Sequence, residues 1–152
     1  MSHLPVNHPL RPFYRVLVAA AGLYVLVFGA IGTVRTSSAP MFDRSDMVVL
    51  GLRTNLAFAL ASIGAGAVIL LAQFVGRNVD FVVNLWGGVL FMAVGLAMMA
   101  LLHTELNVLN FSMTTVIVSF VIGIVLYVGG LYGRSGSESA AAAEELARHG
   151  GH

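Results

Sequence analysis

The central stretch VGRNVD places an arginine, an asparagine and an aspartate, Arg77, Asn78 and Asp80, between two long apolar runs. Such residues can form an ion pair or a proton relay when they lie together in apolar surroundings. In a turn between two membrane helices they would instead be exposed, and an Arg77–Asp80 ion pair would contribute only about 0–1 kcal/mol. Gly76 permits a helix to end, and Asp80 suits the positive end of the next helix dipole. We therefore interpret VGRNVD as a turn of about five residues, 76–80, joining antiparallel helices.

Two other groups of titratable residues could bind a ligand. His103 and Glu105, in LLHTELN, could bind a metal or a quinone headgroup. One histidine and one glutamate in a loop are more often ordinary polar residues at the membrane interface. The histidines of SHLPVNH and HGGH could chelate copper or zinc, yet their ligand set is incomplete and adventitious binding is favoured. These terminal histidines are His3, His8, His149 and His152. We predict no catalytic residue, no metal site and no cofactor.

The composition is that of a membrane protein. Of the 152 residues, 58% are hydrophobic and 10% are charged, and the mean hydropathy is +0.89, whereas an ordinary soluble domain has about 25% charged residues. Cysteine is absent, which excludes disulfides, thiolate metal sites, iron–sulfur ligation and the Cys-x-x-Cys-His attachment of haem. The basic residues are eight arginines spread singly, with a net charge of +1, so no basic stripe indicates nucleic-acid binding.

Four apolar stretches are long enough to cross a bilayer, which requires about 20 residues. Each is expected to be an α-helix, because backbone polar groups in lipid must be satisfied within the segment. The first is about 19 residues long, beyond the roughly 7–15 of a signal-peptide core, so we expect it to stay as an anchor. The predicted fold is an all-α integral membrane four-helix bundle, residues 16–133, with an N-terminal segment 1–15 and a tail 134–152. The spans are 16–34, 56–75, 81–102 and 113–132.

The arginines predict the orientation, because Lys and Arg near span ends are retained in the cytoplasm. One face, with the N-terminus, the second turn and the tail, holds Arg11, Arg15, Arg77, Arg134 and Arg148. The opposite face holds Arg35, Arg44 and Arg53, and its second loop, HTELNVLNF, has no Lys or Arg. Both termini are therefore predicted to be cytoplasmic.

The second span aligns with the fourth at FVGR and LYGR, and the alignment brings other residues into register. The first and third spans share two glycines seven residues apart. This pattern predicts two tandem helical hairpins in the same orientation, related by an axis along the membrane normal, with chance alignment of glycine-rich helices as the alternative. The aligned pairs are Ser62 with Ser119, Gly66 with Gly123, Gly76-Arg77 with Gly133-Arg134, Leu52 with Leu109, and Gly22/Gly29 with Gly88/Gly95.

The same small residues form patterns that let helices approach closely. We predict that they serve helix packing or partner contact, and a substrate groove lined by these glycines is the alternative. They are Ser62-x-x-x-Gly66, Ser119-x-x-x-Gly123, Gly129-x-x-x-Gly133, and the heptad-spaced pairs Gly22/Gly29 and Gly88/Gly95.

Polar segments outside the spans are candidates for partner contact. The first outer loop, RTSSAPMFDRSDMVVLGLRTN, is about 20 residues long, and Ser45 or Asp46 could cap a short segment MVVLGL lying along the interface. In the tail, Ser139 is a plausible cap for a short alanine-rich helix that could dock on a surface. No ionisable residue lies within the hydrocarbon core, which argues against a proton relay, a charged-substrate carrier or a voltage sensor.

Several motifs carry a resemblance to a known family. They are NHPLRPFYRVLVAAAGLYVLVFGAIG, LGLRTNLAF, VGRNVDFVVNLWGG and LNFSMTTVIVSFVIG. Up to about Gly133 the chain resembles an actinobacterial family of small four-span membrane proteins catalogued as a domain of unknown function. The resemblance implies the fold and a location in the plasma membrane, and it brings no catalytic residues.

Small proteins of this size and span number also look like accessory subunits of respiratory enzymes, such as the actinobacterial cytochrome bcc–cytochrome c oxidase supercomplex. We expect a non-catalytic membrane subunit that binds lipids and packs against a larger membrane complex of this kind. The alternative is a small transporter or channel for a neutral solute, motivated by the tandem hairpins and by Gln73 and Asn84. An enzyme using His103 and Glu105 is a third hypothesis.

Overall fold

The computed structural model describes residues 5–149, and His3 and His152 lie outside this range. Four long helices form the bundle, and each is long and apolar enough to cross a membrane. They are α1 (Arg11–Thr36), α2 (Leu56–Val75), α3 (Val79–Leu101) and α4 (Met113–Leu131). The chain is thus a four-span, multi-pass helical membrane protein, which confirms the predicted fold class.

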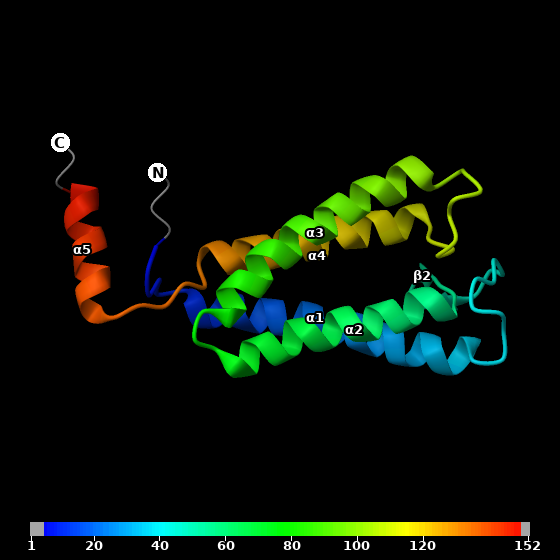
Figure 1. Ribbon diagram of the computed structural model, residues 1–152, viewed down its shortest axis with the longest axis horizontal. Coiled ribbons are helices and arrows are strands. Elements are labelled where there is room, and N and C mark those ends of the chain that lie inside the picture. The colour runs from blue at the N-terminus through cyan, green and yellow to red at the C-terminus, as the bar shows by residue number, and fades with distance from the viewer. Residues whose placement is uncertain (1–4, 150–152) are drawn as a thin grey trace.

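The helices pack as two hairpins. α1 packs along α2 and α3 packs along α4, while the contacts between the hairpins, α1 with α4 and α2 with α3, are far fewer. The hairpins meet at the end that holds the N-terminal segment and the α2–α3 turn, here called the terminal end (Figure 1). They diverge toward the opposite end, here called the loop end, where the α1–α2 and α3–α4 loops lie (Figure 1).

The two hairpins use corresponding glycines in the same way. A Cβ atom on Gly66 of α2 would lie 2.9 Å from the carbonyl oxygen of Gly22 on α1. A Cβ atom on Gly123 of α4 would lie 3.1 Å from the carbonyl oxygen of Gly88 on α3. These are the residues that the sequence register pairs, so the repeated contact favours duplication over chance alignment.

α1 begins at Arg11 rather than at the predicted Val16. Pro12 lies in the first turn, where its missing N–H leaves no hydrogen bond unmade and its fixed φ suits a helix. The extension places Arg11 and Arg15 inside the first helix, whereas the sequence assigned them to the segment before it. This difference determines the chemistry at the terminal end.

The segment MVVLGL is not a single piece lying along the interface. It forms an antiparallel hairpin of two short strands, β1 (Val48–Val49) and β2 (Leu52–Arg53). Leu50 and Gly51 have φ values of 48° and 84°, the left-handed pair that a tight hairpin turn requires. Val49 and Leu52 are buried against Phe28, so the hairpin covers the loop end of α1.

A short fifth helix, α5 (Glu138–His149), follows the bundle as predicted for the tail. Its cap is Ser137 rather than Ser139, because the Ala140 N–H donates to the Ser137 hydroxyl at 3.3 Å. The Val6 N–H donates to a Glu144 carboxylate oxygen at 2.9 Å, which joins α5 to the N-terminal segment.

Candidate functional site

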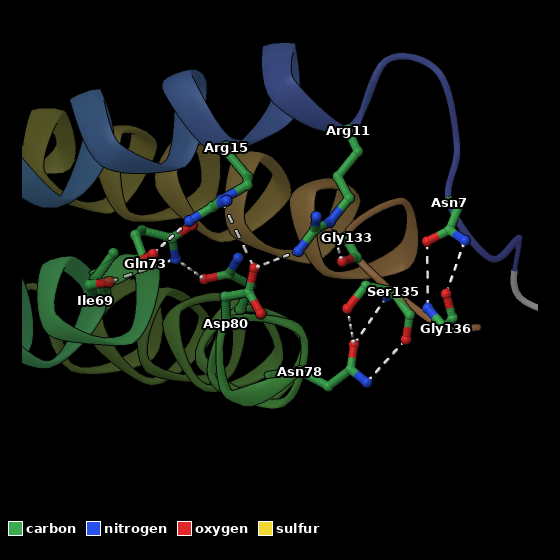
Figure 2. Close-up of polar contacts among 11 residues, drawn as sticks. Asn7, Arg11, Arg15, Ile69, Gln73, Asn78, Asp80, Gly133, Ser135 and Gly136 are labelled. Atoms are coloured by element: carbon green, nitrogen blue, oxygen red, sulfur yellow. Dashed lines mark hydrogen bonds and ion pairs between the residues drawn. The ribbon is translucent and has the colours of Figure 1, made fainter. Parts of the chain in front are cut away.

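Asp80 is a buried carboxylate at the start of α3, with 1% of the residue exposed. Its Oδ2 atom lies 3.4 Å from a terminal nitrogen of Arg11 and 3.8 Å from Nε of Arg15 (Figure 2). Arg77 is exposed and forms no ion pair in the described part of the chain. The predicted exposed Arg77–Asp80 pair is therefore wrong, because α1 extends across the turn and brings its own arginines to the carboxylate.

The two arginines connect α1 to the ends of the other three long helices. Arg11 donates from Nε to the Gly133 carbonyl oxygen, 2.8 Å away, just beyond the C-terminus of α4. Arg15 donates to the carbonyl oxygen of Gln73 in the last turn of α2. Cations thus lie at two helix C-termini and an anion lies at one N-terminus, the arrangement that the helix dipoles favour. We call Arg11, Arg15 and Asp80 the terminal-end ion cluster.

A pair of buried amides continues this cluster into the bundle. Gln73 donates from Nε2 to Oδ1 of Asn84 at 3.0 Å, which joins α2 to α3. The same nitrogen lies 3.4 Å from the Ile69 carbonyl oxygen. Within residues 5–149, Oε1 of Gln73 and Oδ1 of Asp80 are buried without a hydrogen-bond partner. The site therefore combines charge neutralisation with hydrogen bonds between the two hairpins. This arrangement can hold the hairpins together.

The VGRNVD turn also binds its own counterpart in the second hairpin. Gly76, Arg77 and Asn78 have φ values of 62°, 52° and 64°, a left-handed run that only Gly adopts freely. Oδ1 of Asn78 accepts from the Ser135 N–H at 2.8 Å, and Nδ2 donates to the Ser135 carbonyl oxygen at 2.9 Å (Figure 2). The register that aligns Gly76-Arg77 with Gly133-Arg134 aligns Asn78 with Ser135, so equivalent turns contact each other.

Replacing Asn78 separates its two contributions. Asn78→Ala removes the bonds to Ser135 and leaves a left-handed residue with a Cβ, so we expect a loss of about 1–2 kcal/mol of unfolding free energy. Asn78→Gly removes the bonds and relieves the backbone, and should lose less. Thermal unfolding in mild detergent measures both. Equal losses would mean that the backbone conformation contributes nothing.

The predicted helix-packing residues lie mainly between helices of the same hairpin. Ser62 donates to the Phe58 carbonyl oxygen of its own helix at 2.8 Å, whereas Ser119 donates across to Phe91 of α3 at 2.9 Å. A Cβ on Gly88 would lie 2.5 Å from the Tyr127 backbone nitrogen. Added Cβ atoms would also meet neighbours at Gly22, Gly29, Gly95, Gly129 and Gly133; at Gly133 the neighbour is the Gly129 carbonyl oxygen in the last turn of α4.

The other candidate ligands that the structure describes are His8, His103, Glu105 and His149. Glu105 forms an ion pair with Arg44 at 2.8 Å between the two loops, and both side chains are largely exposed. His103 is exposed in the same loop, and the His8 ring packs 4.9 Å from that of Tyr132. Among residues 5–149, no group of three or more His, Cys, Asp or Glu side chains could hold a metal ion.

The shared helix face of Arg11 and Arg15 had a detectable signal in the sequence. Arg11 and Arg15 are four residues apart and therefore lie on one face of a helix that contains both. Because proline is tolerated in the first turn of a helix, Pro12 does not prevent the first helix from starting at Arg11, and a prediction that allowed for this would have included both arginines. What the sequence does not show is that this face lies over the start of α3, because that contact depends on how the two hairpins pack.

The fold and the terminal-end ion cluster define a class, a four-span helical membrane protein built from two hairpins whose helices meet at the terminal end. No protein-family model, no curated protein and no solved structure matches the chain. The family resemblance of the quoted motifs therefore stays a prediction.

Proposed function

We propose that this protein is a non-catalytic subunit that packs within the membrane against a larger integral membrane partner. The observation that carries the proposal is the outward surface of α3. Only 22% of the apolar stretch of α3 is buried inside the protein, against 44% for α4. α3 therefore offers the most side-chain surface of the four spans to a neighbouring helix.

The outward surface of α3 has features suited to helix contact. Ala93 and Ala97 are exposed and four residues apart, and Ala100 continues the same side. Small residues at this spacing allow a second helix to approach closely. Trp86, 67% exposed, lies on this side toward the terminal end and can serve as a large anchor. We call Trp86, Ala93, Ala97 and Ala100 the α3 outer face.

The packing glycines support this placement by elimination. Gly66, Gly88 and Gly123 already contact the partner helix of their own hairpin. They cannot receive a helix from another protein without separating the hairpins. A partner contact of the small-residue type is therefore expected at small residues that remain exposed, as on the α3 outer face, with the exposed loop residues Phe42 and Leu106 available outside the membrane.

The partner that we propose is a respiratory enzyme of the actinobacterial plasma membrane, such as the cytochrome bcc–cytochrome c oxidase supercomplex. Its support is the resemblance in size, span number and motifs. Cytoplasmic termini, as the arginines indicate, would place α5 on the inner side of that complex and the β1–β2 hairpin on the outer side.

A bulky substitution on the α3 outer face tests the proposal. We expect Ala97→Phe to lower partner recovery after mild solubilisation by roughly ten-fold, which corresponds to about 1.4 kcal/mol. Ala20→Phe is the matched control, because Ala20 is exposed on α1. Native electrophoresis and mass spectrometry of the tagged protein measure the recovery. Migration of the wild type alone at low mass would contradict the subunit proposal, and a co-purified partner without haem would contradict only its respiratory part.

The alternative function, a transporter or channel for a neutral solute, has lost part of its motivation. Gln73 and Asn84 helped to motivate it, and they hydrogen-bond to each other where the hairpins meet. Reconstitution into liposomes with a panel of neutral solutes checks this alternative. We expect no flux above that of empty vesicles.

A further inference from the structure

An apolar groove lies between the two hairpins in the half of the bundle nearer the loop end. Its volume is about 250 Å³, and all four long helices contribute to its walls. Its α3 wall runs from Leu90 to Met98, and its α4 wall runs from Thr115 to Ile122. Eight residues of helix span about 12 Å, close to the roughly 15 Å that one leaflet contributes to the hydrocarbon core.

The walls of the groove are almost entirely apolar. Four hydroxyl-bearing residues line it, and each hydroxyl already has a partner within the chain. Ser62 and Ser119 donate to backbone carbonyls, Tyr24 donates to the Leu50 carbonyl at 3.3 Å, and Thr115 accepts from the Ser112 N–H at 3.2 Å. Water is also disfavoured, because a stable buried water needs two to four polar partners.

The groove is closed at both ends along the membrane normal. Toward the terminal end, Val25 and Ile122 line it and belong to the main buried cluster. Toward the loop end, Leu52 and Leu109 line it, and the two loops are joined above them. Asn55 donates to the Val108 carbonyl at 2.8 Å, and Asn110 donates to the Ser45 carbonyl at 2.7 Å. Access is therefore sideways, from within the membrane.

The pseudo-symmetry of the hairpins shows which side is open. The alignment of the first hairpin on the second gives the equivalent positions. Phe28 of α1 corresponds to Val94 of α3 in the register that pairs Gly22 with Gly88. Ala61 of α2 corresponds to Val118 of α4 in the register that pairs Ser62 with Ser119. Phe28 is only 2% exposed, whereas Val94 is 39% exposed. Larger side chains fill the gap between α1 and α4, and smaller ones leave the gap between α2 and α3 open to lipid.

From these observations we infer that the groove between α2 and α3 holds one acyl chain of a membrane phospholipid from the leaflet at the loop end. The chain matches the length of the groove, needs no polar partner, and enters sideways while its headgroup stays at the surface. A protein helix is about 10–12 Å across and does not fit. A quinone ring would lack a hydrogen-bond donor. The occupied groove gains dispersion contacts that an empty one lacks.

Photolabelling in liposomes tests this inference without any partner protein, so its outcome is independent of the proposed function. The probe is a phosphatidylcholine carrying a diazirine in one acyl chain, present at a low fraction in unlabelled phosphatidylcholine. For the wild type we expect labelling at Leu90, Val94 and Met98 that exceeds labelling of the exposed α1 residues by roughly ten-fold, a preference of about 1.4 kcal/mol.

The groove-filling variant introduces at Ala61 and Val94 the larger residues that occupy the equivalent positions between α1 and α4, Val118 and Phe28. Ala61→Val with Val94→Phe should reduce groove labelling to the level of the exposed α1 residues. Ala20→Val with Val27→Phe adds the same volume on the exposed side of α1 and should leave groove labelling unchanged. If the groove variant unfolds, as circular dichroism would show, the wild-type labelling map still decides. Uniform labelling of groove and surface, or recovery of a quinone instead of a phospholipid from the purified protein, would overturn the inference.

Discussion

Replacing Asp80 by alanine is expected to lower the unfolding free energy by about 2–4 kcal/mol, one of the largest effects of any single change at the terminal end. The substitution leaves Arg11 and Arg15 without their anion, and their side chains are 24% and 38% exposed, so water recovers part of the loss. It also removes a negative charge from the first turn of α3, where the dipole favours one. Unfolding in mixed micelles of increasing dodecyl sulfate fraction measures the change.

Two further variants show whether the effect belongs to the ion cluster. Arg77→Ala removes the exposed arginine of the same turn, which has no ion-pair partner in the described chain, and should change stability by no more than about 0.5 kcal/mol. Asp80→Ala combined with Arg15→Ala removes an unpaired cation and should recover part of the loss, since paired residues do not act additively. Wild-type stability in Asp80→Ala would show that the cluster does not hold the hairpins together.

The terminal-end ion cluster also explains how a protein with few contacts between its hairpins keeps one arrangement. The hairpins meet closely at the Asp80 end and diverge toward the loops (Figure 1). Exposed ion pairs contribute little, but Asp80 is 1% exposed and its partners also bind helix C-terminal carbonyls. The three charged residues of the cluster thus connect all four long helices at the terminal end, while the helices diverge around the groove toward the loop end.

The spans and the hairpin order were predictable from the sequence because both depend on local pattern. Long apolar runs can only be helices in lipid, and the short 76–80 turn makes α2 and α3 antiparallel neighbours. The repeated glycines were also visible, since their spacing survives in both halves. These features need no knowledge of which helix faces which.

The Asp80 environment and the groove could not be predicted because they depend on packing between distant segments. Asp80 is 69 residues from Arg11, and a charge beside a turn looks the same in sequence whether it faces water or a neighbouring helix. The groove arises because Val94 stands where the other half has Phe28. That difference has meaning only once the two hairpins are superposed by their symmetry.

Gly66→Ala is expected to lower the unfolding free energy by about 3 kcal/mol, at the upper end of what overpacking a core usually costs. The added Cβ would lie 2.5 Å from the Leu26 backbone nitrogen and 2.8 Å from its Cα. Backbone atoms cannot rotate away as a side chain can, so α1 and α2 must separate along their contact. Dispersion contacts along this helix pair would be lost together, because interior packing leaves no room for a small adjustment.

Gly64→Ala is the matched control on the same helix. No atom lies within 4 Å of a Cβ added at Gly64, so this change should be neutral or stabilise by up to about 1 kcal/mol through helix propensity. Gly123→Ala, at the equivalent position of the second hairpin, should have an intermediate effect because the nearest atom, at 2.7 Å, is the movable Cγ of Met92. Unfolding in mixed micelles ranks the three variants. A loss at Gly64 equal to that at Gly66 would show that helix propensity, rather than the approach of α1 to α2, sets the requirement for glycine.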